Sequence, residues 1–507
     1  MKTQKRFDLK DILNSSLVFF LKYPLSPFLF PIFLCLHTIN FSFEWGTYLD
    51  VWRYFLLNYI LVIVFFLISF LTYRSQVKAG VFALFLLLFY FYFGYLIDLI
   101  GIISQEFTRA RYVLTLLIVL PSAVFYFLYK ADIKRISKLS FYTNIVLSLF
   151  LLIELLTFGY QKIYSKPRQL TYCEQNAFDV PKQSIAPDIY FVVFDEYASS
   201  ASLKENFGYT NSIDSFLITS NFKIITNSKS NYAATPFSIA STLNMSYFEN
   251  IQSTKFPDDF NLACISMYKN RLFSFLSKQG YTIHNYSIID YDDAPSEFEN
   301  FSRDLSLRSV INKTITEIGF VKNFFNAMIY GDTYQYDRWN KIIKQVDINI
   351  ASKKPQPEFT YIHFLLPHSP YYFDENGNIR PMNDYTLQAD QFSVKSYLNQ
   401  VTFTNSVIKK IVSSIQKSQK NTIILLEGDH GFRCFQPKDL KVKDNYFLKE
   451  NNYKNLNAFY FYDKNYSKLY DSISPVNSFR VILNQYFNVN LSLVKDSCCF
   501  NNMDFIE

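Results

Sequence analysis

Residues 187–197 read PDIYFVVFDEY, and this stretch decides the fold of the carboxyl-terminal part of the chain. Its centre is a short, fully apolar run rich in β-branched and aromatic side chains, with Pro-Asp before it and Asp-Glu after it. Such a run is typical of a strand that is buried on both faces of a parallel sheet. The sequence therefore predicts a buried strand that ends at an acidic pair, Asp195 and Glu196.

The same pattern returns further along the chain. Apolar runs occur at residues 360–366 (TYIHFLL), 421–430 (NTIILLEGDH) and 457–462 (NAFYFY), and helical patterns occur at residues 270–279 and 393–416. Alternation of strands and helices indicates an α/β fold with a mainly parallel sheet flanked by helices.

Polar side chains follow three of the predicted strands. Asp195 follows the first strand, His368 follows the run at 360–366, and Asp429 and His430 close the run at 421–430. Because the carboxyl ends of parallel strands meet at one edge of a sheet, we expect these residues to lie close together. Two carboxylates and an imidazole suit Zn²⁺ or Mn²⁺, so Asp195, Asp429 and His430 are candidate metal ligands. Asp429 and His430 alone would also fit a loop cap.

A candidate nucleophile lies in residues 230–245, SNYAATPFSIASTLNM, where a helix is predicted from about residue 237. Thr235 precedes Pro236, which suits a first helical turn. A hydroxyl there would lie beside free backbone N–H groups and the positive end of the helix dipole, which favour anions. Thr235 could equally be the amino-terminal cap of the helix, and the residues themselves do not separate the two roles.

The first 160 residues contain five apolar stretches close to the length of a membrane-spanning helix. They cover residues 25–43, 54–73, 80–100, 112–129 and 142–160, and Tyr and Trp gather near several of their ends. The first has no small-residue cleavage site after it, so we expect a retained anchor.

Positive charges predict the orientation of these spans. They concentrate before the first span and between the second and third and the fourth and fifth, at Lys2, Lys5, Arg6, Lys10, Lys22, Arg74, Lys78, Lys130, Lys134, Arg135 and Lys138, whereas the alternate loops hold only Arg53, Arg109 and Arg111. The amino terminus is expected inside, and the soluble part outside the cytoplasmic (inner) membrane. The predicted domains are a membrane domain at 1–161, a linker at 162–186 and a catalytic domain at 187–507.

The net charge of +7 is modest for 507 residues, and the Lys residues are scattered. No basic face with interleaved aromatic side chains is recognisable, so nucleic acid is not an expected partner.

In order, PDIYFVVFDEY, NYAATPFSIASTLN, LLPHSPYYFD and EGDHG resemble the motifs of the alkaline phosphatase and sulfatase superfamily. The chain is similar to its membrane-anchored branch, which includes lipoteichoic acid synthases and phosphoethanolamine transferases. The resemblance implies that Asp195, Asp429 and His430 bind a divalent metal together with the hydroxyl of Thr235, the nucleophile. It implies that His368 binds substrate, stabilises the leaving group or holds a second metal.

The sequence departs from the family pattern in two respects. Transferases of the branch often carry Glu at the position of Asp195, so the adjacent Glu196 is a rival ligand. Sulfatases that use formylglycine need a C/S-x-P-x-R sequence, which residues 235–238 do not match. Arg480 is either an anion contact or a buried structural residue, and a structural role is favoured.

The resemblance implies a transferase that moves phosphoglycerol or phosphoethanolamine from a membrane phospholipid donor to an envelope glycan or lipid acceptor, such as teichoic acid or lipopolysaccharide, through a phospho-threonine intermediate. One alternative is a hydrolase of phosphate or sulfate esters that uses water as the acceptor. Another is an inactive scaffold of envelope assembly.

Overall fold

A computed structural model describes residues 18–41, 43, 51–103, 107, 110–166, 168–173, 186–251, 256–297, 334–352, 355–381, 393–418, 420–433 and 450–499. The chain divides into two compact units, and the first boundary between them falls after Arg168. Part of the predicted linker, residues 174–185, lies outside the described residues.

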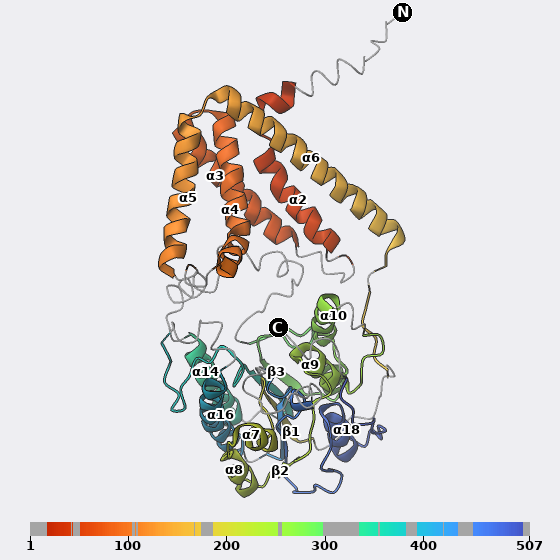
Figure 1. Ribbon diagram of the computed structural model, residues 1–507. Coiled ribbons are helices and arrows are strands. Elements are labelled where there is room, and N and C mark those ends of the chain that lie inside the picture. The colour runs from red at the N-terminus through yellow and green to blue at the C-terminus, as the bar shows by residue number, and fades with distance from the viewer. Residues whose placement is uncertain are drawn as a thin grey trace, which may run out of the picture. The chain divides into compact units, whose positions relative to one another are not determined.

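The first unit consists of apolar helices, one at each predicted span. They are α2 (Ser26–Phe41), α3 (Val51–Tyr73), α4 (Gln76–Ile103), α5 (Ala110–Lys130) and α6 (Ile133–Tyr164) (Figure 1). Within the described residues, three segments are long and apolar enough to cross a membrane, at Gln76–Gly101, Arg111–Lys130 and Ile133–Tyr164. Two shorter apolar helices cover Ser26–Phe41 and Asn58–Tyr73. Helix α6 continues into the region predicted as linker, because residues 162–164 extend its last turn.

Polar side chains join the amino-terminal part of the chain to α6. The buried amide of Asn144 accepts a hydrogen bond from the Ser26 N–H at 2.7 Å and donates to the carbonyls of Phe20 and Tyr23. Many large apolar side chains of these helices are exposed, including Leu67 and Leu156. An apolar exterior with polar interhelical contacts is compatible with a lipid environment.

The second unit contains a six-stranded sheet in the order β2-β6-β5-β1-β4-β3. The strands are β1 (Asp188–Phe194), β2 (Lys223–Ile224), β3 (Thr282–Tyr286), β4 (Glu358–Phe364), β5 (Thr422–Gly428) and β6 (Asn457–Phe461). Neighbours β3, β4, β1 and β5 pair in parallel, whereas β6 runs antiparallel to β5. The prediction of a mainly parallel α/β sheet is confirmed, with β6 as an antiparallel addition.

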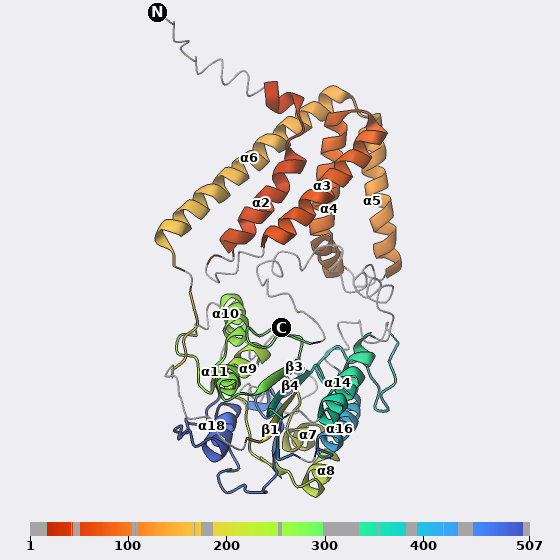
Figure 2. The ribbon, with the colours of Figure 1, turned by 180° about the vertical axis from the view of Figure 1, so that it is seen from behind.

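Helices cover both faces of this sheet, as the two opposite views show (Figures 1 and 2). One face packs on α7 (Ser200–Phe207), α8 (Ile213–Thr219), α14 (Tyr334–Ala351) and α16 (Val394–Ile415). The other is covered by α9 (Thr235–Asn244), α11 (Arg271–Lys278) and α18 (Pro475–Tyr486), and α10 (Phe256–Tyr268) packs on α9. All seven residues of β1 are buried, which explains its apolar run.

Strand register determines where the predicted site residues lie. Phe194 at the end of β1 is in register with Gly428 at the end of β5 and with Phe364 at the end of β4. Asp195 and Asp429 therefore emerge from adjacent strands at the same level. The loop after β4 reaches this edge too, because the His368 N–H donates to the Asp195 carbonyl at 3.1 Å.

Candidate metal centre

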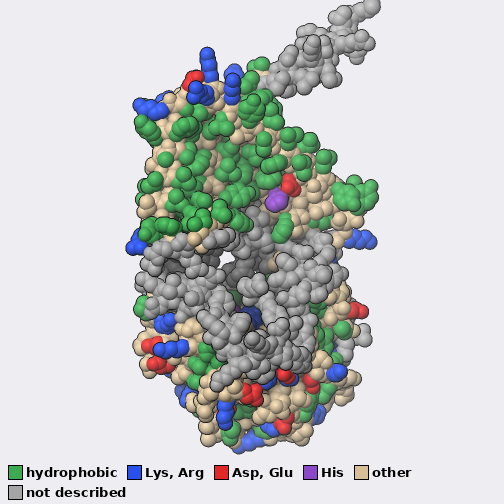
Figure 3. Space-filling view, viewed as in Figure 1, with side chains coloured by type: hydrophobic (Ala, Val, Ile, Leu, Met, Phe, Trp, Pro, Cys, Tyr) green, Lys and Arg blue, Asp and Glu red, His purple; other side chains and the backbone are tan. Residues whose placement is uncertain are grey.

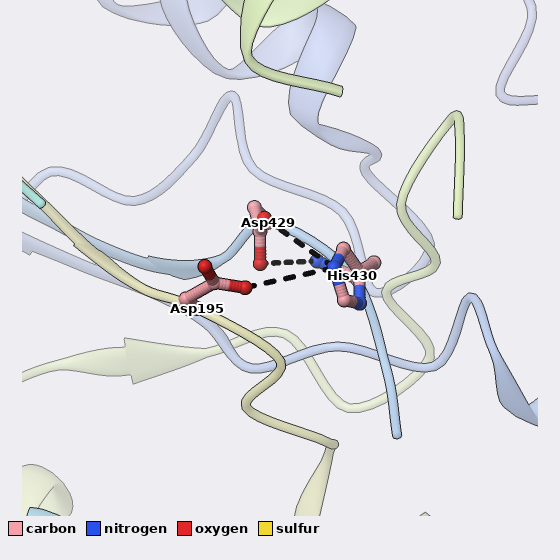
Figure 4. Close-up of side chains that lie close together, drawn as sticks. All are labelled: Asp195, Asp429 and His430. Carbon is pink, nitrogen blue, oxygen red and sulfur yellow. Dashed lines mark hydrogen bonds and ion pairs between the residues drawn. The ribbon is translucent and has the colours of Figure 1, made fainter. Parts of the chain in front are cut away.

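Asp195, Asp429 and His430 converge at the carboxyl ends of β1 and β5. One ligand atom from each residue lies within 4.8 Å of the other two. His430 Nε2 is 3.6 Å from Asp195 Oδ1 and 3.5 Å from Asp429 Oδ2. Figure 4 shows both carboxylates beside the His430 imidazole. All three residues are buried.

Hydrogen bonds fix which atoms of these residues face the centre. Asp429 Oδ1 accepts from the N–H groups of Glu196 and His430, each at 2.9 Å, which leaves Oδ2 for the centre. His430 Nδ1 lies 2.8 Å from the Gly431 carbonyl, so Nδ1 carries the proton and Nε2 presents its lone pair. A backbone partner that orients the second nitrogen in this way is usual for a metal-binding histidine.

The atoms that face one another have no hydrogen-bond partner. Asp195 Oδ1, Asp429 Oδ2 and His430 Nε2 are all buried and unsatisfied. A buried acceptor without a donor is costly, and here three acceptors share one small volume. Two carboxylate oxygens and one imidazole nitrogen are a donor set for Zn²⁺ or Mn²⁺, so these residues fit a divalent cation.

The ionisation of these groups points in the same direction. Burial, followed by the Asp429 carboxylate, raises the pKa of Asp195 to about 7. Burial also holds the pKa of His430 well below its ordinary value, so its imidazole is neutral. Carboxylates that repel each other in a buried site, beside a neutral imidazole, would be stabilised by a cation.

Two glycines next to the site residues allow neighbouring backbone segments to approach closely. A Cβ atom on Gly428 would lie 2.4 Å from the Tyr197 carbonyl oxygen, and one on Gly431 would lie 2.3 Å from the Asn451 carbonyl oxygen. Both contacts are with backbone, which cannot move aside cheaply. The glycines of EGDHG are therefore required by packing on either side of Asp429 and His430.

Glu196, the rival of Asp195, faces a different group. Its carboxylate accepts from the Arg433 N–H at 3.0 Å, and its Oε2 lies 3.9 Å from His368 Nε2. Its φ of 62° is a left-handed conformation that is uncommon outside glycine. Because the backbone turns in this way, the side chains of Asp195 and Glu196 face different neighbours. The geometry favours Asp195 over Glu196 as the third member of the cluster.

His368 lies beside the cluster with Glu196 and Arg433. The guanidinium of Arg433 approaches His368 Nε2 at 3.4 Å and donates to the Ala233 carbonyl at 3.1 Å. Burial lowers the pKa of His368, but the carboxylates of Asp195 and Glu196 outweigh this and raise it above its ordinary value. His368 is thus a partly exposed imidazole at the edge of the centre.

Thr235 is the first residue of α9, and the structure excludes one of its two possible roles, that of the helix cap. The amino-terminal cap is Ala234, with φ −139° and ψ 137°, and no side chain caps this helix. Thr235 is therefore not the cap. The helix begins two residues earlier than the predicted start at about residue 237, with Pro236 in its first turn.

Contacts on either side of Thr235 join α9 to the strand ends. Ser238 Oγ donates to the Asp429 carbonyl at 2.5 Å, and Ala233 accepts from Arg433 as described above. The amino terminus of α9 is therefore held against the loop that carries Asp429 and His430. The partly exposed Thr235 lies at the end of the helix where backbone N–H groups favour anions.

Arg480 is a structural residue, as favoured from the sequence. Its guanidinium is buried and donates to the carbonyl of Met245, with Nε at 2.8 Å, and to the carbonyl of Ser492. Met245 is the carboxyl-terminal cap of α9, at the opposite end of the helix from Thr235. Arg480 thus stabilises the negative end of that helix.

Sequence reasoning missed Arg433 and Ser238. Arg433 follows EGDHG by two residues, and that position was the available signal. Ser238 is one of several small polar residues in α9, and nothing in the sequence distinguishes it from Ser241. Only the approach of α9 to β5 gives Ser238 its partner.

Comparisons with known proteins identify the family of the chain. A sulfatase family model matches residues 192–477, which include Asp195, Thr235, His368, Asp429 and His430. No curated protein is significantly similar to the chain.

The solved structures that are similar to this chain include two periplasmic domains and a putative sulfatase. The carboxyl-terminal periplasmic domain of EptC from Escherichia coli, in complex with Zn, has 10% identity and a TM-score of 0.38, over 61% of this chain and 84% of that one. The periplasmic domain of phosphoethanolamine transferase EptC from Campylobacter jejuni has 13% identity and a TM-score of 0.38, over 61% and 92%. The putative sulfatase YidJ from Bacteroides fragilis has 12% identity and a TM-score of 0.38, over 64% and 79%.

The family model covers more than half of the chain and includes every predicted site residue. The protein therefore belongs to the sulfatase family.

Proposed function

We propose that this protein is a membrane-anchored, metal-dependent phosphotransferase. It moves a phosphoglycerol or phosphoethanolamine group from a phospholipid to an envelope glycan or lipid such as lipopolysaccharide or teichoic acid. The observation that carries the proposal is the buried cluster of Asp195, Asp429 and His430 beside the amino terminus of α9, where Thr235 is the first residue. Apolar helices in the same chain suit a lipid donor.

Thr235, Asp195, Asp429 and His430 would hold the metal. A divalent ion bound there would lower the pKa of the Thr235 hydroxyl and neutralise charge on phosphoryl oxygens. Whether it is Zn²⁺ or Mn²⁺ follows from metal analysis of the purified protein.

The reaction proceeds in two displacements. Thr235 Oγ forms a bond to phosphorus while the bond from phosphorus to the glycerol oxygen of the lipid breaks, which gives a phospho-threonine and a diacylglycerol. His368, which Glu196 and Arg433 hold in place, binds the substrate oxygens at the edge of the site. The acceptor hydroxyl then attacks phosphorus, and the bond to Thr235 Oγ breaks.

The catalytic unit lies outside the inner membrane in this proposal. The support is the distribution of Lys and Arg, which places the amino terminus and the loop between α5 and α6 in the cytoplasm. With an odd number of membrane crossings, Thr235 would lie in the compartment that contains envelope glycans.

Replacement of Thr235 tests the mechanism. Full-length protein and its Thr235→Ala variant are incubated with a phospholipid labelled in the headgroup, and mass spectrometry locates the label on the protein. The wild type is expected to carry a phosphorylated Thr235 and the variant none. Thr219→Ala, at an exposed position of α8, is the matched control. Full transfer activity in Thr235→Ala would disprove the nucleophile.

Two other functions give different products. A hydrolase would release the same labelled group to water whether or not an acceptor glycan is present. An inactive scaffold would bind neither Zn nor Mn and release no diacylglycerol. The hydrolase route through formylglycine is disfavoured, because residue 235 is Thr and no Arg follows in the required register.

A further inference from the structure

An ionisable cluster lies among the apolar helices of the first unit. His37 Nδ1 on α2 is 2.8 Å from Glu154 Oε1 on α6, and the Asn40 amide donates to Glu154 Oε2 at 2.6 Å. The Glu154 side chain is 13% exposed and that of His37 is 49% exposed. Figure 3 shows a histidine and an acidic side chain side by side on the apolar surface of these helices. Because ionisable groups in apolar spans are costly, such a pair indicates a functional site.

The cluster has more acceptors than donors. Asn40 Oδ1 and Gln161 Oε1 are buried without a hydrogen-bond partner, although the Gln161 amide donates to the Asn40 carbonyl at 3.1 Å. Asn40 as a whole is 8% exposed. Together with the Glu154 carboxylate, these oxygens suit a cation with several N–H donors.

An apolar groove adjoins the cluster. It has a volume of about 380 Å³ and is lined by side chains of α2, α4 and α6: Phe30, Phe33, Leu84, Tyr92, Val146 and Phe150. Phe33 links the two features, because its ring stacks on His37 at 5.6 Å and packs against Phe150 at 5.8 Å. The groove extends from the cluster toward the amino-terminal ends of α2 and α6, so a lipid could place its headgroup at Glu154 and an acyl chain in the groove.

We propose that this site binds a phospholipid whose headgroup is a protonated primary amine, as in phosphatidylethanolamine. The ammonium has three N–H donors and a positive charge for Glu154, Asn40 and Gln161. A choline headgroup has the charge without the N–H donors, and a glycerol headgroup has no positive charge to pair with Glu154. That the bound lipid is the donor rests on the proposed function, whereas its binding does not.

Native mass spectrometry of the full-length protein in detergent measures the binding. The Thr235→Ala background prevents any transfer from consuming lipid, and equal amounts of POPE, POPC and POPG are added. We expect POPE to be retained about tenfold more than POPC or POPG. Glu154→Gln, which keeps the shape of the side chain but removes its charge, should abolish this preference.

Two further variants separate a specific site from a disturbed helix bundle. Val146→Trp places a large side chain at an exposed position of the groove and should reduce retention of all three lipids. Thr157→Val, one turn from Glu154 on α6, removes a hydroxyl that donates to the Ile153 carbonyl of its own helix and should change nothing. Equal retention of POPE and POPC, or a POPE preference that survives Glu154→Gln, would overturn the proposal. A POPE preference with no phospho-threonine in the wild type would refute the transferase alone.

Discussion

Asp429 contacts three other residues of the site: Glu196, His430 and Ser238. Its Oδ1 accepts from two backbone N–H groups, its carbonyl accepts from Ser238, and its Oδ2 faces His430. The carboxylate therefore orients the end of β1 and the imidazole, and the backbone carbonyl holds the start of α9. Removal of its charge should affect the metal more than the fold.

We predict that Asp429→Asn lowers metal affinity and transfer activity by at least about 100-fold. The amide oxygen can still accept from Glu196 and His430, so the loop keeps its hydrogen bonds while the ligand charge is lost. Metal content by plasma mass spectrometry and headgroup release are the measurements. Asp471→Asn, at an exposed carboxylate that pairs with Lys223, is the control. Normal metal content in Asp429→Asn would refute the assigned ligand.

Helix α9 depends on Ser238 for its position against β5. We predict that Ser238→Ala destabilises the protein by about 1–2 kcal/mol, because it removes a buried hydrogen bond and leaves the Asp429 carbonyl without that donor. Activity should fall by about tenfold, since a small displacement of Thr235 disturbs the alignment of an attacking oxygen. Thermal unfolding in detergent and headgroup release test both effects.

Ser241→Ala is the matched control for that variant. Ser241 is equally buried on the same helix, but its hydroxyl bonds the Ser238 carbonyl within α9 and does not reach β5. An activity loss of the same size in both variants would show that helix stability, and not the link to Asp429, is responsible.

Strand β3 carries a pH-sensitive contact at the edge of the sheet. His284 Nδ1 lies 2.8 Å from Glu297, and its Nε2 lies 3.6 Å from Glu358 on β4. Burial lowers the pKa of His284, but these two carboxylates outweigh it and raise the pKa from 6.5 to about 9. A raised folded pKa stabilises the protein fully below pH 6.5, and this stabilisation is lost as the pH rises through 9.

We therefore predict that His284→Gln is destabilising by about 1–3 kcal/mol at pH 6 and by much less above pH 9.5. Chemical unfolding of the detergent-solubilised protein at both pH values measures the difference. Glu375→Gln, at an exposed position, should show no such dependence. A deficit that is the same at pH 6 and pH 9.5 would contradict the ion pairs.

At the scale of the whole molecule, the orientation in the membrane is the property to test. Fusions of green fluorescent protein after residue 138, near the amino-terminal end of α6, should fluoresce, because this end of α6 and the loop before it are expected in the cytoplasm, where Lys and Arg are retained. Fusions of a secreted alkaline phosphatase after residue 168 should be enzymatically active, because that reporter folds only outside. The reversed pattern would place Thr235 in the cytoplasm and exclude envelope glycans as acceptors.

The sequence by itself determined the classes of structure. Strands β1, β4 and β5 are apolar because both faces of each are buried, and the apolar helices of the first unit lack a polar face, so local composition reveals both. It also placed Asp195, His368, Asp429 and His430 at strand ends. The sequence did not reveal the direction of each strand. NAFYFY has the same pattern in either direction, and β6 is antiparallel to β5. Strand β3, with two half-buried residues at the sheet edge, has no such run and was missed.

Only the tertiary structure decided the roles of neighbouring residues. Register brings Asp195 to Asp429, and the left-handed backbone of Glu196 directs that side chain to His368 and Arg433. The same packing makes Ala234 the cap of α9 and gives Ser238 its partner, Asp429, directly after β5. The physical reason is that composition and periodicity report what a segment buries, whereas the direction of a single side chain depends on the segment that packs against it.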